Sequence, residues 1–197
     1  MKHTFYILLV ALVAVFAAVS CKKPSVSSTN TEQGEPGPGP GPEPATVTNS
    51  VVLDGVVLPI TGAITSRTQF IDEGIFGMNI YYEGDVSSNS RVCMTLYGDR
   101  HFGKTIDLTA RESVLDNTGW SIFCMKLGNI LFKANGIPSS DEGLFTSGTL
   151  NAERLDDSSD SPVVKIEIKD GVICDNKYGD KAEHTFYMHY QGSLMLL

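Results

Sequence analysis

Histidine, serine and methionine are among the residue types in this sequence with the chemistry for catalysis or metal binding. No GxSxG, HExxH, dinucleotide fingerprint or CxxC motif occurs in the chain, so none of these short motifs assigns an activity. His101, His184 and His189 lack a neighbouring partner in the sequence that would indicate a catalytic triad. The sequence therefore predicts a protein that is not an enzyme and needs no cofactor.

His184 and Met188 form the pair whose types would suit a metal or haem iron. They are four positions apart, which in a β-strand separates them by about 13 Å. One iron cannot bind both, so we predict that His184 lies at the edge of a core strand. Two acidic segments, 156–160 and 175–180, carry the oxygen ligands that Ca²⁺ prefers. Neither has EF-hand spacing, and we interpret both as solvated turns, with no metal site.

Amphipathic aromatic side chains are the best candidates for a binding surface. Tyr187 and His189 lie on the more polar face of the last predicted strand, and Tyr81 and Tyr82 lie on an earlier one. Side chains of this kind on an exposed sheet face are typical of protein and glycan recognition. We therefore predict these four as candidate ligand-binding residues.

The N-terminal segment predicts export and lipid attachment at Cys21. Residues 1–20 combine a basic start with an apolar run that is shorter than the roughly 18 residues of a membrane-spanning helix. Ala18-Val19-Ser20 before Cys21 resembles the bacterial lipobox, whose cysteine receives diacylglycerol, although Leu usually stands where this chain has Ala18. Cleavage at the same point without lipid is the alternative. Acyl chains on Cys21 would anchor the protein in a membrane.

We predict that residues 21–48 consist of the lipidated Cys21 followed by a disordered tether. Proline and glycine alternate in this segment, and few of its side chains could enter a core. Lys22 follows Cys21, where an Asp would indicate inner-membrane retention by resemblance to enterobacterial lipoproteins. We therefore expect the outer membrane of the cell envelope and leave open which side the domain faces.

Residues 49–197 are long enough to bury a core without disulfides or metal. The chain has a net charge of −8 and this segment has no basic stripe, which excludes nucleic acid as a partner. Cys93 and Cys124 lie in apolar runs, where a free cysteine behaves as a small buried hydrophobe. One disulfide among these two and Cys174 is the alternative, and spacing does not give the pairing.

Short apolar runs separated by turns predict an all-β domain over residues 49–197. Val164, Ile166 and Ile168 alternate with charged residues, which places one strand face in a core. Asp54-Gly55 predicts a type I′ hairpin, and Gly128-Asn129 a second one. Thr109 and Glu112 have capping-box spacing and predict one short helix. We expect a single antiparallel β-barrel or β-sandwich of about eight to ten strands.

Several turn-like motifs resemble uncharacterised β-rich lipoproteins of the Bacteroidetes. The motifs are the Asp54-Gly55 opening, Ser147-Gly148-Thr149-Leu150, the alternating strand 164–168 and the ending His189-Tyr190-Gln191-Gly192-Ser193-Leu194. The resemblance implies a calycin-like barrel or sandwich with no assigned activity. It implies a fold and no catalytic residue.

Two functional hypotheses follow. The first is a cell-envelope lipoprotein, attached to the membrane through lipid on Cys21, that binds or assembles with a protein or glycan partner. The second is a carrier of a small apolar ligand in the barrel interior. A carrier needs a cavity of about 300 Å³ or more with convergent polar groups. Because the predicted core contains many large side chains, we rank the binding or assembly role first.

Overall fold

A curled β-sheet dominates the computed structural model, which describes residues 48–65, 74–84, 86–113, 118–156, 161–175 and 177–197. These residues belong to one unit of the chain, Glu32–Leu197. The predicted signal peptide, Cys21 and the tether up to residue 47 lie outside the described residues. No helix in the described ranges is long and apolar enough to cross a membrane.

Within the described residues, eleven strands make up the sheet, and one α-helical turn and one 3₁₀ turn lie between them. The helical segments are η1 (Val86–Ser88) and α2 (Gly98–His101). The strands are β1 (Ser50–Leu53), β2 (Val56–Thr65), β3 (Ile75–Tyr82), β4 (Arg91–Tyr97), β5 (Thr105–Asp107), β6 (Ser121–Lys126), β7 (Asn129–Asn135), β8 (Ser147–Asp156), β9 (Val163–Cys174), β10 (Glu183–Ser193) and β11 (Met195–Leu196).

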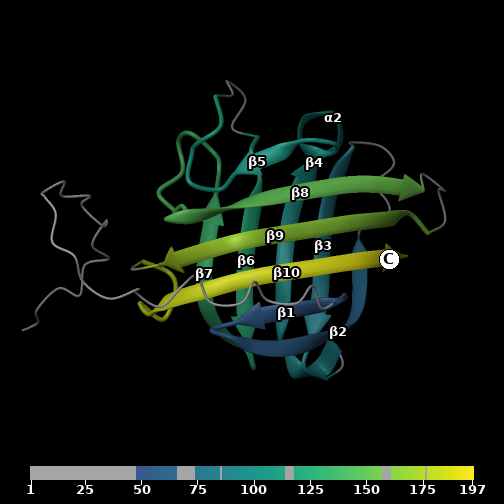
Figure 1. Cartoon of the computed structure of the whole chain (residues 1–197), viewed down its shortest axis with the longest axis horizontal. Coiled ribbons are helices and arrows are strands. Elements are labelled where there is room, and N and C mark those ends of the chain that lie inside the picture. Colours follow the sequence, from purple (N-terminus) through teal and green to yellow (C-terminus); the bar gives the residue numbers. More distant parts are fainter. Residues whose placement is uncertain (1–47, 66–73, 85, 114–117, 157–160, 176) are drawn as a thin grey trace, which may run out of the picture. The chain divides into compact units, whose positions relative to one another are not determined.

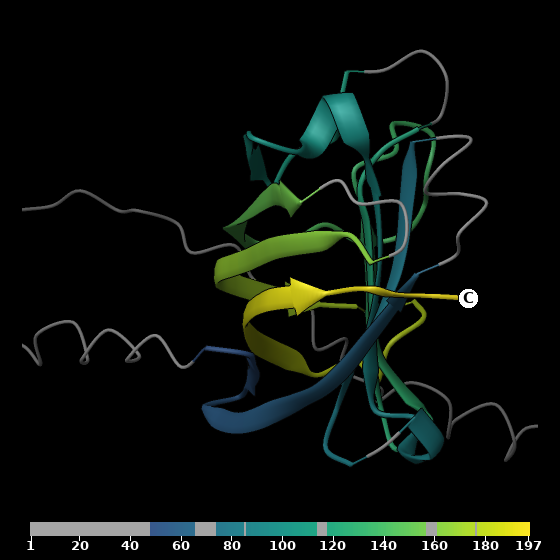
Figure 2. The ribbon, with the colours of Figure 1, turned by 90° about the vertical axis from the view of Figure 1, so that its right-hand side faces the viewer.

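The sheet folds over on itself into two layers. Its strand order is β5-β8-β9-β10-β1-β2-β3-β4-β6-β7, and all neighbours on this path are antiparallel. In Figure 1 the front layer, β5, β8, β9, β10 and β1, runs across the rear layer, β3, β4, β6 and β7. Figure 2 shows the two layers facing each other. The all-β prediction is confirmed as a half-barrel.

Strand β2 belongs to both layers and turns the sheet from one to the other. Its first residues pair with β1 in the front layer and its last residues pair with β3 in the rear layer. The register shifts between Ile60 and Gly62, where a bulge lets the strand bend. The short β11 then pairs with the end of β2 in parallel.

The core lies between the two layers and is filled by large side chains. Val164, Ile166 and Ile168 are all fully buried, as their alternation predicts. Inward-facing positions alternate along the strands of both layers. Aromatic rings from these positions fill the space between the layers. The largest fully buried side chains include Trp120, Tyr82, Phe76, Phe132 and Phe186.

The two predicted hairpin turns both occur, one of them displaced by a residue. Asp54 and Gly55 have φ of 51° and 78°, the left-handed pair that a type I′ turn requires. Between β6 and β7 the left-handed residues are Leu127 and Gly128, with φ of 50° and 82°. The turn therefore begins one residue before the predicted Gly128-Asn129.

The helix predicted to begin at Thr109 is wrong. The Asp107 carboxylate accepts hydrogen bonds from the Thr109 backbone N–H at 2.8 Å and the Thr109 hydroxyl at 2.7 Å, which closes a turn. Glu112, the second residue of the expected capping box, directs its side chain to His101 and to the Trp120 backbone instead. The helical turn α2 lies earlier, at Gly98–His101.

Candidate functional site

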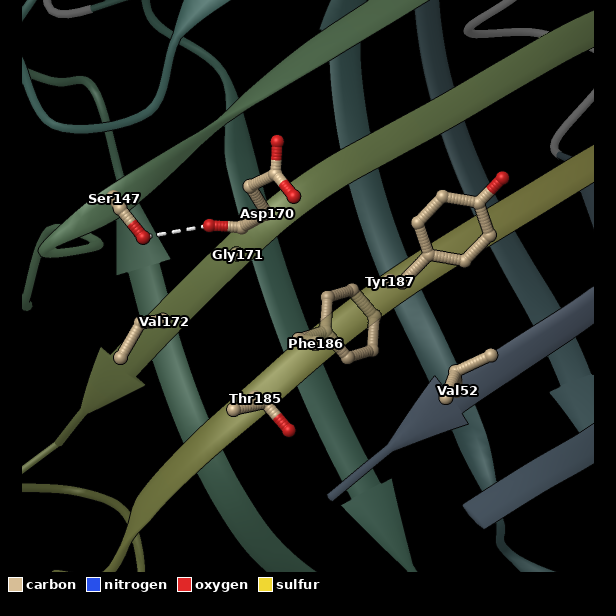
Figure 3. Close-up of a pocket in the computed structure, with 8 residues that line it drawn as sticks. All are labelled: Val52, Ser147, Asp170, Gly171, Val172, Thr185, Phe186 and Tyr187. Atoms are coloured by element: carbon tan, nitrogen blue, oxygen red, sulfur yellow. Dashed lines mark hydrogen bonds between the residues drawn. The ribbon is translucent and has the colours of Figure 1, made fainter. Parts of the chain in front are cut away.

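The outer face of the front layer carries a hollow of about 330 Å³, which we call the Asp170 hollow (Figure 3). It opens to solvent across strands β8, β9, β10 and β1. A hollow of this size lies at the lower end of the range of ligand pockets, which begins at about 300 Å³. Its lining consists of Val52, Ser147, Asp170, Gly171, Val172, Thr185, Phe186 and Tyr187.

A β-bulge in the middle of β9 creates this hollow. Between Ile168 and Gly171, β9 contains one residue more than β10 contains between Met188 and Phe186. The pairing of β8 with β9 shifts at the same place. Asp170 has a left-handed φ of 52°, and asparagine and aspartate are the non-glycine residues that most readily adopt it. Both Lys169 and Asp170 consequently point outward.

The strands around the bulge are held close together by a side chain and a glycine. The Ser147 hydroxyl donates a hydrogen bond to the Asp170 carbonyl at 2.6 Å, as the dashed line in Figure 3 marks. A Cβ atom on Gly171 would lie 2.5 Å from the Phe186 carbonyl oxygen, so only glycine allows β9 to approach β10 this closely. The floor of the hollow is therefore closely packed backbone.

An apolar strip forms one side of the hollow. Val52 pairs with Tyr187 on β10 and with Val57 on β2, so the three side chains form a row across three strands. Val57 is 49% exposed although it is a large aliphatic residue. Figure 3 shows Val52 and Tyr187 on one side of the hollow and Val172 on the other.

Of the four predicted ligand-binding residues, only Tyr187 lines the Asp170 hollow. His189 lies on the same outer face but is 4% exposed, and its Nδ1 accepts a hydrogen bond from the Asn49 backbone N–H at 3.4 Å. Tyr81 and Tyr82 belong to β3 in the rear layer, away from Tyr187. The structure therefore does not bring the four together.

Tyr82 is a core residue, which corrects its expected position on an exposed face. Its side chain is fully buried, and its hydroxyl donates a hydrogen bond to the Met125 carbonyl at 2.6 Å. The same oxygen lies 3.4 Å from the Cys124 thiol. Burial raises the pKa of Tyr82 and raises that of Cys124 to about 12, so both groups stay protonated. Tyr81 is also buried, at 6% exposed.

His184 joins three segments of the chain at the start of β10. Its Nδ1 lies 2.9 Å from the Asp54 carboxylate in the β1–β2 turn, and its Nε2 lies 3.0 Å from the Asp180 carboxylate. The ring is 6% exposed and packs beside Phe132. Burial opposes the charged form, but the two carboxylates outweigh it and the pKa of His184 is raised above 6.5. Both ring nitrogens face carboxylates, which only accept hydrogen bonds, and the imidazolium form satisfies both contacts.

We expect His184 to stabilise the fold most below pH 6.5. Because its pKa is raised in the folded state, this contribution is complete below the unfolded value of 6.5 and disappears as the pH rises through the folded value. Urea unfolding of wild type and His184→Gln should differ by about 1 kcal/mol at mildly acidic pH and by less at alkaline pH. A difference that grows with rising pH would contradict the bridge.

His101 forms a second buried contact, under α2. Its Nδ1 accepts a hydrogen bond from the Tyr97 backbone N–H at 2.8 Å, so its Nε2–H faces Glu112 Oε1 at 2.9 Å. Burial lowers the pKa of His101, while Glu112 partly opposes that shift. The other Glu112 oxygen accepts the Trp120 backbone N–H. The pair thus connects two loops and lies away from the Asp170 hollow.

In the acidic segment 175–180, the Asp175 carboxylate accepts hydrogen bonds from nearby backbone N–H groups. Asp175 is buried and accepts backbone N–H groups of Lys133, Lys177 and Tyr178. The interpretation of this segment as a solvated turn is therefore wrong for Asp175, which fastens the loop to β7. Most of the other segment, 157–160, lies outside the described residues. Within the described part of the chain, no three His, Cys, Asp or Glu side chains cluster as metal ligands.

Sequence reasoning missed most of the Asp170 hollow. Val52, Asp170 and Val172 belong to predicted or adjoining strands, and nothing marks them individually as binding residues. One signal was present: Asp170-Gly171 interrupts a long alternating strand, and a glycine inside a strand pattern indicates a bulge or a close backbone approach. Cys21 lies outside the described residues, so its predicted lipidation stays a prediction.

No family model matches this chain, and comparisons with curated proteins and with solved structures find no match either. The fold and the site define an all-β half-barrel with a ligand-sized hollow on its outer face. The function must therefore be argued from that surface.

Proposed function

We propose that this protein is a lipid-anchored protein of the cell envelope, of the Bacteroidetes lipoprotein type, that binds a protein or glycan partner without catalysis. The observation that carries the proposal is the Asp170 hollow, which combines an exposed apolar strip with a carboxylate on the outer face of the sheet. Exposed apolar surface with a polar rim is typical of interaction sites.

The filled interior supports surface binding over the alternative of an apolar-ligand carrier. Trp120, Phe132 and Phe186 lie between the two layers with at most 1% of their surface exposed. The Asp170 hollow lies instead on the outer face of the front layer, where outward-facing residues such as Val52, Thr185 and Tyr187 make up most of its lining. A ligand inside the half-barrel would have to displace these rings, and close-packed cores resist such displacement.

The histidine contacts support a role without catalysis. His101 and His184 hydrogen-bond to carboxylates, and His189 accepts a backbone N–H. Each of these three rings therefore stabilises a junction between segments. In His101 and His184 these contacts occupy both ring nitrogens, so neither ring is free to serve as the base of a serine or cysteine nucleophile.

Lipidation of Cys21 is tested by the intact mass of the protein purified from membranes. We expect a mature N-terminus at Cys21 carrying diacylglycerol, because Cys21 directly follows the small residues of the lipobox. The Cys21→Ser variant should remain uncleaved or leave the membrane fraction. A Cys21 without acyl chains, with its thiol free or in a disulfide, would contradict the lipoprotein proposal.

Binding through the hollow is tested by photo-crosslinking in cells. A photoreactive residue in place of Val57, which flanks the hollow, should give a discrete adduct whose partner is identified by mass spectrometry. Leu127 is the matched control, because it is a more exposed aliphatic residue, 66% against 49%, in the β6–β7 turn. Equal adducts at both positions would show that exposure alone drives the reaction, and the proposed site would be rejected.

A further inference from the structure

The Asp170 hollow contains two chemically different parts. Its walls are apolar, formed by Val52, Val172 and the ring of Tyr187. At its edge is the Asp170 carboxylate, placed outward by the bulge in β9. A ligand that fits both parts must combine an apolar stem with a group that a carboxylate attracts.

The Asp170 carboxylate has no hydrogen-bond or ion-pair partner among the residues that the structure describes. The neighbouring cation, Lys169, lies 3.2 Å from the Glu167 carboxylate and is drawn away from Asp170. On the same face Lys165 pairs with Glu153 at 3.3 Å. The negative charge at the hollow is therefore not neutralised locally, and the chain as a whole carries −8, which attracts cationic partners.

We propose that the Asp170 hollow holds an arginine or lysine side chain of a partner protein, which rests on the binding role proposed above. The aliphatic stem would pack on Val52 and Val172, as the stems of these cationic residues do on apolar surfaces. The cationic group would reach the Asp170 carboxylate and lie beside the Tyr187 ring, where charge-assisted hydrogen bonding and cation–π attraction act together.

A glycan fits this hollow less well than a cationic side chain. Sugar hydroxyls need several hydrogen-bonding groups that converge on the ligand. The Ser147 hydroxyl already donates to the Asp170 carbonyl, and the remaining polar side chains of the lining are Asp170, Thr185 and the Tyr187 hydroxyl. The chiefly apolar lining and the single carboxylate favour one amphipathic cation.

The test is an NMR titration of the full mature chain with ¹³C-labelled tyrosine rings. The probes are N-acetyl-arginine amide, its uncharged isostere N-acetyl-citrulline amide, and N-acetylglucosamine. We expect the Tyr187 signal to shift with the arginine probe, which should bind at least about tenfold more tightly than the citrulline probe. Equal binding of the two, or a response to N-acetylglucosamine alone, would overturn the proposal.

Asp170→Asn is the decisive variant, because asparagine also tolerates the left-handed φ of this position and should preserve the bulge. We expect it to abolish the preference for arginine over citrulline. Glu153→Gln is the matched control: it removes another carboxylate from the same face, at a distance from the hollow lining, and should leave the preference intact. Loss of the preference in both variants would assign it to the general charge of the face and overturn the proposal.

The test of the arginine or lysine ligand can fail independently of the test of the proposed binding role. Crosslinking at Val57 detects any occupant, whatever its chemistry. Adducts at Val57 together with an unaltered arginine preference in Asp170→Asn would retain the binding role and reject the cation. Self-association of the purified chain that competes with the arginine probe would assign the hollow to a second copy and also reject a separate partner.

Discussion

Replacement of Ile166 by aspartate is expected to unfold the protein. Ile166 is fully buried between the two layers, and the new carboxylate would face only apolar side chains. Burial of an unpaired charge of this kind costs at least about 4 kcal/mol, a large fraction of the roughly 5–15 kcal/mol by which a typical domain is stable. Urea unfolding monitored by circular dichroism should show no folded baseline, or a midpoint close to zero denaturant.

Glu167→Ala is the control on the adjacent residue. Glu167 points to the outer face and forms an ion pair with Lys169, and such surface pairs contribute between about 0 and 1 kcal/mol. We expect the unfolding midpoint to change little. Comparable losses for the two variants would mean that β9 is inverted before its bulge, with Lys165 and Glu167 inside.

Phe132→Ala is expected to cost about 3–5 kcal/mol of unfolding free energy. The Phe132 ring is fully buried and contacts Phe145 and Phe186 edge-on, with centroid distances of 5.7 Å and 5.2 Å. It also packs beside His184. Removal of the ring would leave a cavity where β7 meets β10, and the loss should appear in both urea and thermal unfolding.

Phe123→Ala removes the same side chain from the outer face of the neighbouring strand. Phe123 is half-buried and is covered by Lys133, whose Nζ lies 5.0 Å from the ring centroid. We expect a loss of about 1 kcal/mol. If Phe132→Ala were no worse than this, the aromatic cluster would not be close-packed.

The alternating strands and tight turns could be predicted from the sequence because they depend on local patterns. Val164, Ile166 and Ile168 point to one face whatever they pair with, and Asp54-Gly55 suits one type of hairpin turn. The Thr109 helix failed because Glu112 bonds to His101 and Trp120, contacts that form only in the folded chain. The capping-box spacing contains no information about these competing partners.

The candidate site was harder to predict because it depends on pairing between distant strands. Tyr81 and Tyr82 must face opposite sides of β3, but only the fold decides that Tyr82 enters the core. His189 occupies an outward position of its strand, as a surface residue would. It is nevertheless buried, because Asn49, far away in the sequence, contacts it. The hollow itself requires β8, β9 and β10 to meet at Asp170.

The bulge at Asp170 makes the hollow separable from the core of the fold. Ile168 and Gly171 both point inward, with two outward residues between them. A strand lacking Asp170 would still alternate without interruption and would bury the same apolar side chains. The loss or gain of one codon could thus remove or create the hollow while the core stays the same. On the proposed binding role, the sheet would serve as the scaffold and the extra residue would shape the surface that meets the partner.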